Sequence, residues 1–201
     1  MKNLFLSFFA IGLVFLISCG EGEVIVTVDP AIQRAADIAI IEEYLTSKGY
    51  DPSTVDTTES GVRYVILDEG QTGFDSLSID ESDIVDFDYI GRLTNDKLFD
   101  TTIESITQED TAIFEDGRVY IPVLINYSST GWTISGRFIT GFTDGVSSTF
   151  NKVHVGGRIL IIFPSDLGYR GVPQFSNGGI ETIPANSVIT FELRPVRVTK
   201  Q

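Results

Sequence analysis

The feature that most constrains the fold is a series of short segments with the alternating pattern of β-strands, which begins near Gly61 and continues to the end of the chain. In the segment DIVDFDYIGRL, Val85, Phe87 and Tyr89 fall on one side, whereas the two aspartates between them fall on the other. Successive side chains of a strand point to opposite faces, so this pattern predicts a sheet with one face on the core. Further candidate strands are GVRYVILDEG, RVYIPVLI, GWTISGRFI, GGRILIIF and SVITFELRPVRV.

One segment inside this strand-rich region has helical spacing instead. In FITGFTDGVSSTFNKV, Phe142, Val146 and Phe150 recur every four residues, which places them on one face of a helix. Many strands and one internal helix predict an α+β fold, in which an antiparallel β-sheet wraps around one short α-helix.

A second helix is predicted ahead of this domain and outside it, in DPAIQRAADIAIIEEYLTSKGY. Asp29 is suited to cap its first turn and Pro30 to occupy the first helical position, while Gly49 ends the pattern. The expected length is about 18 residues. Its expected apolar face consists of Ile32, Ala36, Ile40 and Leu45. The turn-rich segment 51–60, DPSTVDTTES, is interpreted as a linker.

The N-terminal sequence MKNLFLSFFAIGLVFLISCG has the features of an export signal. Lys2 precedes an apolar run from Leu4 to Ile17, whose 14 residues are too few to span a bilayer comfortably. The run leads into LISC, which resembles the lipobox of bacterial lipoproteins and implies removal of residues 1–18 and lipidation of Cys19, the only cysteine. Two or more acyl chains there give stable membrane anchoring. The alternative is a signal peptide followed by a chance cysteine or a free thiol.

The composition argues against several classes of function. The formal charge is −14 and becomes −15 when the leader takes Lys2 away, so the protein repels phosphate backbones and nucleic acid is not an expected partner. His154 is the only histidine, and neither a G-x-S-x-G nor a G-x-x-x-x-G-K-[ST] motif occurs. One histidine and one lipidated cysteine do not make an ordinary zinc site. We therefore expect no cofactor and no metal, and we interpret the acidic run DSLSIDESDIVDFD as a solvated face or loop rather than a calcium site.

Three stretches, in this order, resemble the FKBP-type peptidyl-prolyl isomerases: DFDYIGRLTNDKLFDTT, FITGFTDGV, and VGGRILIIFPSDLGYRG followed by IPANSVITFEL. The resemblance implies an FKBP-like antiparallel β-sheet around one short α-helix over residues 61–199, preceded by a tether, helix and linker at 19–60. The lipobox, the short helix and ESGVRYVILDEG are similar to lipoprotein members of this family from Gram-negative bacteria.

The resemblance also implies a shallow apolar pocket for proline, in which the Tyr169 hydroxyl hydrogen-bonds a substrate carbonyl. The residues implied as catalytic are Tyr89, Phe99, Asp100, Phe142 and Tyr169. Those implied as substrate-binding are Phe138, Ile139, Ile183 and Phe191, with the Ile139 backbone N–H as a candidate donor. Taken singly, the aromatic residues are better explained as core and Tyr169 as part of an ordinary glycine-rich loop, and Asp100 can also be an ordinary turn residue. The ordered match of three stretches favours the pocket.

The sequence departs from the family pattern at two places. Phe142 replaces the tryptophan that usually forms the pocket floor. Between Asp100 and Phe138 lie 37 residues, which predicts an insertion at about 103–137. Part of it, NYSSTGWTISG, is predicted to form a hairpin that carries Trp132, the only tryptophan. A flap that contacts substrate or a surface that binds a partner is one open interpretation, and a tolerated surface insertion is the other.

These features predict a lipid-anchored peptidyl-prolyl cis-trans isomerase of the cell envelope, acting on proline-containing polypeptides among exported proteins. The alternatives are a low-turnover FKBP-like chaperone or peptide-binding lipoprotein, and a scaffold for an unrelated partner. A monomer is expected, because a helix of about five turns is short compared with the N-terminal helices through which some exported relatives dimerise. Gly20 stands where enteric bacteria place an aspartate for inner-membrane retention. Outer-membrane anchoring is therefore expected, with the domain facing the periplasm or the cell surface.

Overall fold

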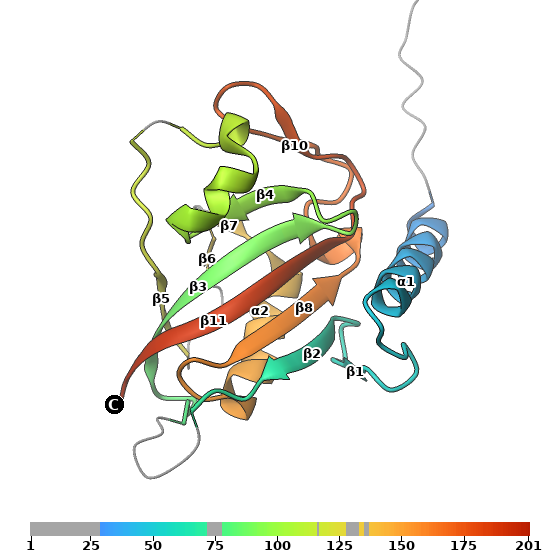
Figure 1. Ribbon diagram of the computed structural model, residues 1–201. Helices are drawn as coiled ribbons and strands as arrows, with labels where there is room; N and C mark the ends of the chain where they lie inside the picture. Colours follow the sequence, from blue (N-terminus) through green and yellow to red (C-terminus); the bar gives the residue numbers. More distant parts are fainter. Residues whose placement is uncertain (1–28, 72–77, 116, 128–132, 135–136) are drawn as a thin grey trace, which may run out of the picture.

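The computed structural model describes residues 29–201, except 72–77, 116, 128–132 and 135–136 (Figure 1). The predicted signal sequence, Cys19 and Trp132 lie outside the described residues. An antiparallel sheet curves around helix α2, and helix α1 comes before it in the chain, which confirms the predicted α+β fold. Among the described helices, none is long and apolar enough to cross a membrane.

The main sheet has the strand order β1-β2-β8-β11-β3-β4, with β5 also paired to β3. Two small two-stranded sheets are formed by β9 with β10 and by β6 with β7. The strands are β1 Asp56–Thr57, β2 Arg63–Asp68, β3 Ile84–Leu93, β4 Leu98–Thr101, β5 Val123–Asn126, β6 Thr133–Ile134, β7 Arg137–Phe138, β8 Arg158–Phe163, β9 Gln174–Phe175, β10 Glu181–Ile183 and β11 Ile189–Thr199. The helices are α1 Pro30–Ser47 and α2 Thr140–Thr149, with short 3-10 helices η1 Glu104–Glu109, η2 Thr111–Ile113, η3 Phe150–Lys152 and η4 Ser165–Leu167.

Strand β8 shows how the sheet is held, because both of its faces are buried. Ile159, Ile161 and Phe163 belong to the core between the sheet and α2. The intervening Leu160 and Ile162 pack instead with residues of α1 on the outer face. A strand covered on both sides needs a continuous apolar run rather than alternation, and the sequence RILIIF is such a run.

The ends of α1 agree with the sequence prediction. The side chain of Asp29 accepts a hydrogen bond from the backbone N–H of Ala31 at 2.8 Å, and Pro30 occupies the first helical position. Gly49 follows the helix with a φ of +83°, a left-handed conformation that glycine adopts without strain. The 18-residue length is confirmed as well.

The apolar face predicted for α1 is wrong except at Leu45. Ile32 and Ile40 are 65% and 39% exposed, whereas Ile41 and Leu45 are buried. The buried face also contains Asp37, which is fully buried. A carboxylate at the N-terminal end of the buried face interrupts the apolar spacing, so the apolar pattern places the face about one residue away from its position in the structure.

The segment 51–60, predicted as a linker, is part of the fold. Asp56 and Thr57 pair with β2 as the edge strand β1. The side-chain hydroxyl of Thr58 donates to Asp144 of α2 at 2.5 Å, and the hydroxyl of Ser60 donates to the same carboxylate oxygen. A two-residue strand among turn-forming residues has no periodicity by which the sequence could reveal it.

The predicted insertion is tied to the main sheet. Its strand β5 pairs with β3, with Phe87 opposite Val123 and Ile84 opposite Asn126. Strand β4 pairs with the other end of β3, so the two strands share one edge of it. The strand predicted from Arg118 begins only at Val123, immediately after Pro122, whose missing N–H is poorly suited to a strand interior.

Two glycines allow α2 to approach the sheet closely. A Cβ atom at Gly141 would lie 2.5 Å from the ring of Phe163, and one at Gly145 would lie 2.8 Å from Ile161. Both distances are far shorter than a favourable carbon–carbon contact of about 3.5–4.0 Å. The helix therefore reaches this position only because both residues lack a side chain.

Gly141→Ala is expected to destabilise the protein by about 1–3 kcal/mol, because the added methyl group overlaps the packed ring of Phe163. The sign is diagnostic, since glycine-to-alanine changes within helices normally stabilise by about 0.5–1 kcal/mol. Urea unfolding followed by circular dichroism measures the change, with Ser147→Ala at an exposed position of α2 as the control. A variant as stable as the wild type would contradict this close approach.

Candidate functional site

Phe191 on β11 is the centre of a cluster of aromatic rings. The rings of Phe99, Phe142 and Tyr89 meet it edge-on, with centroids 5.4, 5.2 and 5.6 Å away. The ring of Phe163 stacks on it at 6.0 Å. Edge-to-face and stacked pairs at such distances stabilise beyond the burial of their area. The cluster therefore forms a tightly packed part of the core on the inner side of the sheet.

The glycine at position 91 makes room for two of these rings. A Cβ atom on Gly91 would lie 2.6 Å from the ring of Phe99 and 2.9 Å from the ring of Phe191. In the sheet, Gly91 on β3 lies between Asp100 on β4 and Phe191 on β11. The missing side chain therefore lets rings from two neighbouring strands meet above β3.

A set of polar contacts borders this cluster. The Tyr89 hydroxyl donates to Asp100 Oδ2 at 2.5 Å. Asp100 Oδ1 accepts from Arg118 Nη2 at 2.7 Å and from the backbone N–H of Thr101 at 2.9 Å. Arg118 Nη2 also donates to the Thr101 carbonyl oxygen at 3.1 Å. Both oxygens of the Asp100 carboxylate are thus held, which fixes its orientation beside the rings.

Arg118 comes from the insertion and packs between two aromatic rings. Its guanidinium carbon lies 5.3 Å from the ring centroid of Phe114 and 5.4 Å from that of Tyr120. Burial lowers the pKa of this guanidinium, but the charge of Asp100 and its hydrogen bond outweigh burial, so the pKa rises above its ordinary value. Arg118 therefore stays cationic and balances the Asp100 carboxylate.

Tyr169 lies in the loop SDLGYRG, which follows β8. The loop closes on itself, because the backbone N–H of Arg170 donates to the Ser165 carbonyl at 2.9 Å. The backbone N–H of Asn186 donates to the Arg170 carbonyl at 2.6 Å and ties the loop to the segment before β11. Tyr169 is half-buried and packs against the same core as Phe191. The loop therefore holds the tyrosine ring at the border of the aromatic core.

The structure brings most of the predicted site residues together. Those that belong to one buried core are Tyr89, Phe99, Ile139, Phe142, Ile183 and Phe191. Tyr169 packs against this core, and Asp100 is joined to it through the Tyr89 hydroxyl. Phe138 differs, since it is 57% exposed on β7, next to the buried Ile139.

Two parts of this region were not predicted from the sequence. One is Arg118, which the sequence places in a strand, and whose bond to Asp100 joins residues 18 positions apart. The other is a cavity of about 500 Å³ that adjoins Phe99 and Asp100. The rest of its lining comes from the insertion and from the β9–β10 region: Ile113, Glu115, Arg118, Phe175, Ser176, Asn177 and Thr182. The one signal in the sequence that could have indicated this region is Arg118, a cation between the aromatic residues Phe114 and Tyr120 in an acidic insertion.

The chain is similar to known proteins both in its family pattern and in its sequence. The sequence pattern of the family described as FKBP-type peptidyl-prolyl cis-trans isomerase matches residues 76–194. The chain is 28% identical over 152 residues to the "Probable FKBP-type peptidyl-prolyl cis-trans isomerase" of Haemophilus influenzae, a match that covers 76% of this chain and 47% of that protein. It is 28% identical over 159 residues to the FKBP-type isomerase FkpA of Aeromonas hydrophila, covering 79% and 46%. The chain thus spans about half the length of both relatives.

Two solved structures are also similar to this chain. The crystal structure of FkpA from Escherichia coli has a TM-score of 0.48 at 22% identity and covers 84% of this chain and 62% of that chain. A peptidyl-prolyl isomerase from Pseudomonas syringae has a TM-score of 0.48 at 17% identity and covers 87% and 98%. The sequence match carries the assignment, because the family pattern covers more than half of the residues: this chain belongs to the FKBP-type peptidyl-prolyl cis-trans isomerase family.

Proposed function

We propose that this protein is a peptidyl-prolyl cis-trans isomerase that accelerates rotation about X–Pro bonds in exported proteins, acting as a monomer. The observation that carries the proposal is a carboxylate, Asp100, held by both oxygens at the edge of the buried ring cluster around Phe191. Phe99 and Asp100 also line a cavity, which offers an apolar wall for a proline ring and oriented polar groups for the peptide beside it. Membership of the isomerase family supports the same activity.

The reaction needs a site of this kind and little else. Double-bond character opposes rotation about a peptide bond with a barrier of about 18–20 kcal/mol. The two X–Pro isomers are close in energy, yet they interconvert only in tens to hundreds of seconds. A catalyst must bind the twisted amide better than either planar isomer. An acceleration of about 10⁴-fold corresponds to a preference of about 5.5 kcal/mol.

The residues divide this work in the following way. Phe99, which lines the cavity beside Asp100, contacts the proline, and the buried rings of Phe142 and Phe191 support Phe99 from behind. This apolar wall keeps water from the amide carbonyl, whose hydrogen bonds to water stabilise the planar form. The Tyr169 hydroxyl donates to a carbonyl of the bound peptide. Twisting the amide withdraws the nitrogen lone pair from the carbonyl carbon, and the fixed charge of Asp100 stabilises the electron-poor carbon that results.

A second candidate is a low-turnover FKBP-like chaperone or peptide-binding lipoprotein that uses the same surface. Phe142 favours it, since its ring is 1% exposed and packs edge-on against Phe191. A phenyl ring has no N–H with which to orient a substrate, unlike an indole. The protein would then grip apolar or proline-bearing segments without rapid turnover.

We further propose that a lipid on Cys19 anchors the chain in the cell envelope, at the outer membrane, with the domain facing the periplasm or the cell surface. The support is the sequence LISC after a 14-residue apolar run. Dual or triple acylation of one cysteine is sufficient for stable anchoring.

The isomerase activity is tested on a panel of X–Pro tetrapeptides with soluble protein that begins at Glu21. Wild-type protein is expected to accelerate isomerisation. Asp100→Ala should lower kcat/KM about tenfold or more, because it removes the fixed charge. Tyr169→Phe should lower it by about three- to tenfold, because it removes one hydrogen bond to the substrate. Tyr50→Phe is the matched control, since this half-buried tyrosine lies with the outer-face residues and should retain full activity.

The absence of acceleration across the panel, in protein shown to be folded, would contradict the isomerase proposal. Binding of unfolded clients by the same protein would then support the second candidate. Equal activity of Asp100→Ala and the wild type would show that the site lies elsewhere.

Lipid attachment is tested by metabolic labelling with a fatty acid in a Gram-negative host, followed by membrane fractionation. The full chain is expected to incorporate label and to float with outer membranes. Cys19→Ser should abolish both results, because serine has no thiol to acylate. Label retained by Cys19→Ser, or a soluble wild-type protein, would rule out anchoring through Cys19.

A further inference from the structure

Helix α1 is attached by a buried carboxylate to the loop that carries Tyr169. Asp37 is fully buried, and its Oδ2 accepts from the backbone N–H of Ser165 at 2.8 Å and from the Ser165 hydroxyl at 2.6 Å. The side-chain amide of Gln33 donates to Asp37 Oδ1 at 2.7 Å. A buried carboxylate is costly unless donors surround it, and these three bonds supply the donors. The two bonds from Ser165 define where that residue lies relative to α1, and the bond from Gln33 holds the carboxylate within the helix.

A second contact joins the same helix to the next residue of the loop. Arg34 Nη1 donates to the two carboxylate oxygens of Asp166 at 2.6 and 2.7 Å, and Arg34 Nη2 donates to the Ser60 carbonyl at 2.6 Å. Ser165 and Asp166 begin η4, and the loop closes four residues later through Arg170. The base of the Tyr169 loop is therefore fixed from the outer side of the sheet.

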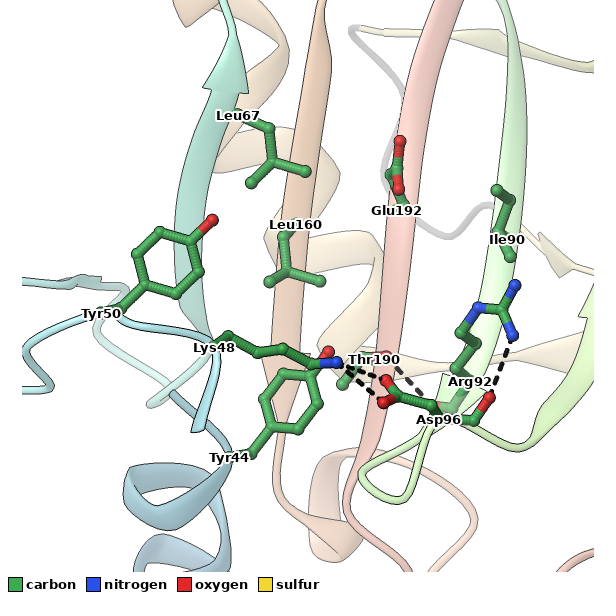
Figure 2. Close-up of a pocket in the computed structure, with 10 residues that line it drawn as sticks. All are labelled: Tyr44, Lys48, Tyr50, Leu67, Ile90, Arg92, Asp96, Leu160, Thr190 and Glu192. Atoms are coloured by element: carbon green, nitrogen blue, oxygen red, sulfur yellow. Dashed lines mark hydrogen bonds and ion pairs between the residues drawn. The ribbon is translucent and has the colours of Figure 1, made fainter. Parts of the chain in front are cut away.

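The C-terminal end of α1 reaches the turn before Asp100. Lys48 Nζ contacts both carboxylate oxygens of Asp96 at 2.8 Å, and Arg92 Nη1 donates to the Asp96 carbonyl at 2.9 Å. Figure 2 shows these side chains meeting over the strands, close to Tyr44 of the helix. Asp96 lies in the β3–β4 turn with a φ of +67°, and β4 after it carries Asp100. This ion pair is exposed and therefore contributes less than the buried bonds of Asp37.

We propose that α1 is a positioning element of the isomerase site, in which Asp37 sets the place of the Tyr169 loop and Lys48 assists at the turn before Asp100. This inference rests on the proposed function. The helix precedes residues 76–194, so it belongs to the part of the chain outside the match to the family pattern.

A helix that merely covered the sheet would need only its apolar contacts. Ile41 and Leu45 already supply these against the outer face of β8. Asp37 adds nothing to apolar burial, but it aims its carboxylate at a backbone N–H, which fixes a main-chain position directly. The apolar contacts hold the helix on the sheet, and the buried carboxylate of Asp37 in addition positions the loop.

The test compares two substitutions at one position. Asp37→Ala leaves both donors of Ser165 without their acceptor, so the loop that carries Tyr169 is expected to shift by well under 1 Å. A shift of this size in a substrate-contacting group should lower kcat/KM about tenfold. Asp37→Asn is the conservative rescue, because its carbonyl oxygen still accepts from Ser165 and Gln33 can turn its amide oxygen toward the new NH₂ group. Most of the activity should therefore remain. Glu43→Gln, exposed on the same helix, is the control and should equal the wild type.

Amide hydrogen exchange gives a readout that does not depend on activity. In Asp37→Ala, exchange in residues 166–171 is expected to accelerate, while β8 and β11 keep the protection of the wild type. A purely stabilising helix would instead raise exchange throughout the sheet, or leave the loop unchanged. Folded fractions measured at the assay temperature separate a local effect from partial unfolding.

Full activity and unchanged loop exchange in folded Asp37→Ala would overturn the inference. If the wild-type protein does not isomerise X–Pro bonds, the proposed function fails, and loop exchange alone then decides whether α1 positions the loop. If Asp37→Ala does not fold, Arg34→Met replaces it, because that contact is partly exposed. We expect a smaller loss of activity with the same local rise in exchange, and no change in either would overturn the inference.

Discussion

The rest of the structure depends on the burial of both faces of strand β8. Ile159 and Ile161 pack toward α2 on the inner face, and Leu160 and Ile162 pack toward α1 on the outer face. The loop that carries Tyr169 leaves the end of this strand, and its first turn, η4, contacts both helices. One strand thus joins the outer helix, the inner core and the candidate site.

The candidate site combines rigid apolar packing with one oriented charge. Rings from three strands and α2 meet around Phe191, which is possible because Gly91 leaves the space above β3 open. Asp100 is held on both oxygens, by Tyr89 on one side and Arg118 on the other. Proline isomerisation makes and breaks no covalent bond, so it does not need groups that exchange protons. It needs groups held in fixed positions, which cannot rearrange to stabilise the planar amide as well as the twisted one. The proposed activity therefore rests on the fixed positions of Asp100 and the rings around Phe191.

The sequence predicts best what is decided locally. Asp29 and Gly49 mark the ends of α1, because capping depends on residues within one turn of each other. The sequence does not predict the buried face of the same helix, because Asp37 binds Ser165, which lies 128 positions away. The sequence does not predict the role of Arg118 either, because its partner Asp100 is also distant in the chain. Strand β1 has only two residues, which is too short for an alternating pattern. The ring cluster was predicted only through the ordered resemblance of three stretches, since periodicity alone does not distinguish a pocket from a core.

The central claim is that X–Pro peptides bind at the ring cluster around Phe191. Amide chemical-shift mapping by NMR, with isotope-labelled protein and a proline-containing tetrapeptide, tests it most directly. The account predicts that the largest shifts occur at Asp100, Ile139 and Tyr169, and that the outer-face residue Tyr44 is unaffected. Shifts concentrated on the outer face, or none at saturating peptide, would contradict it.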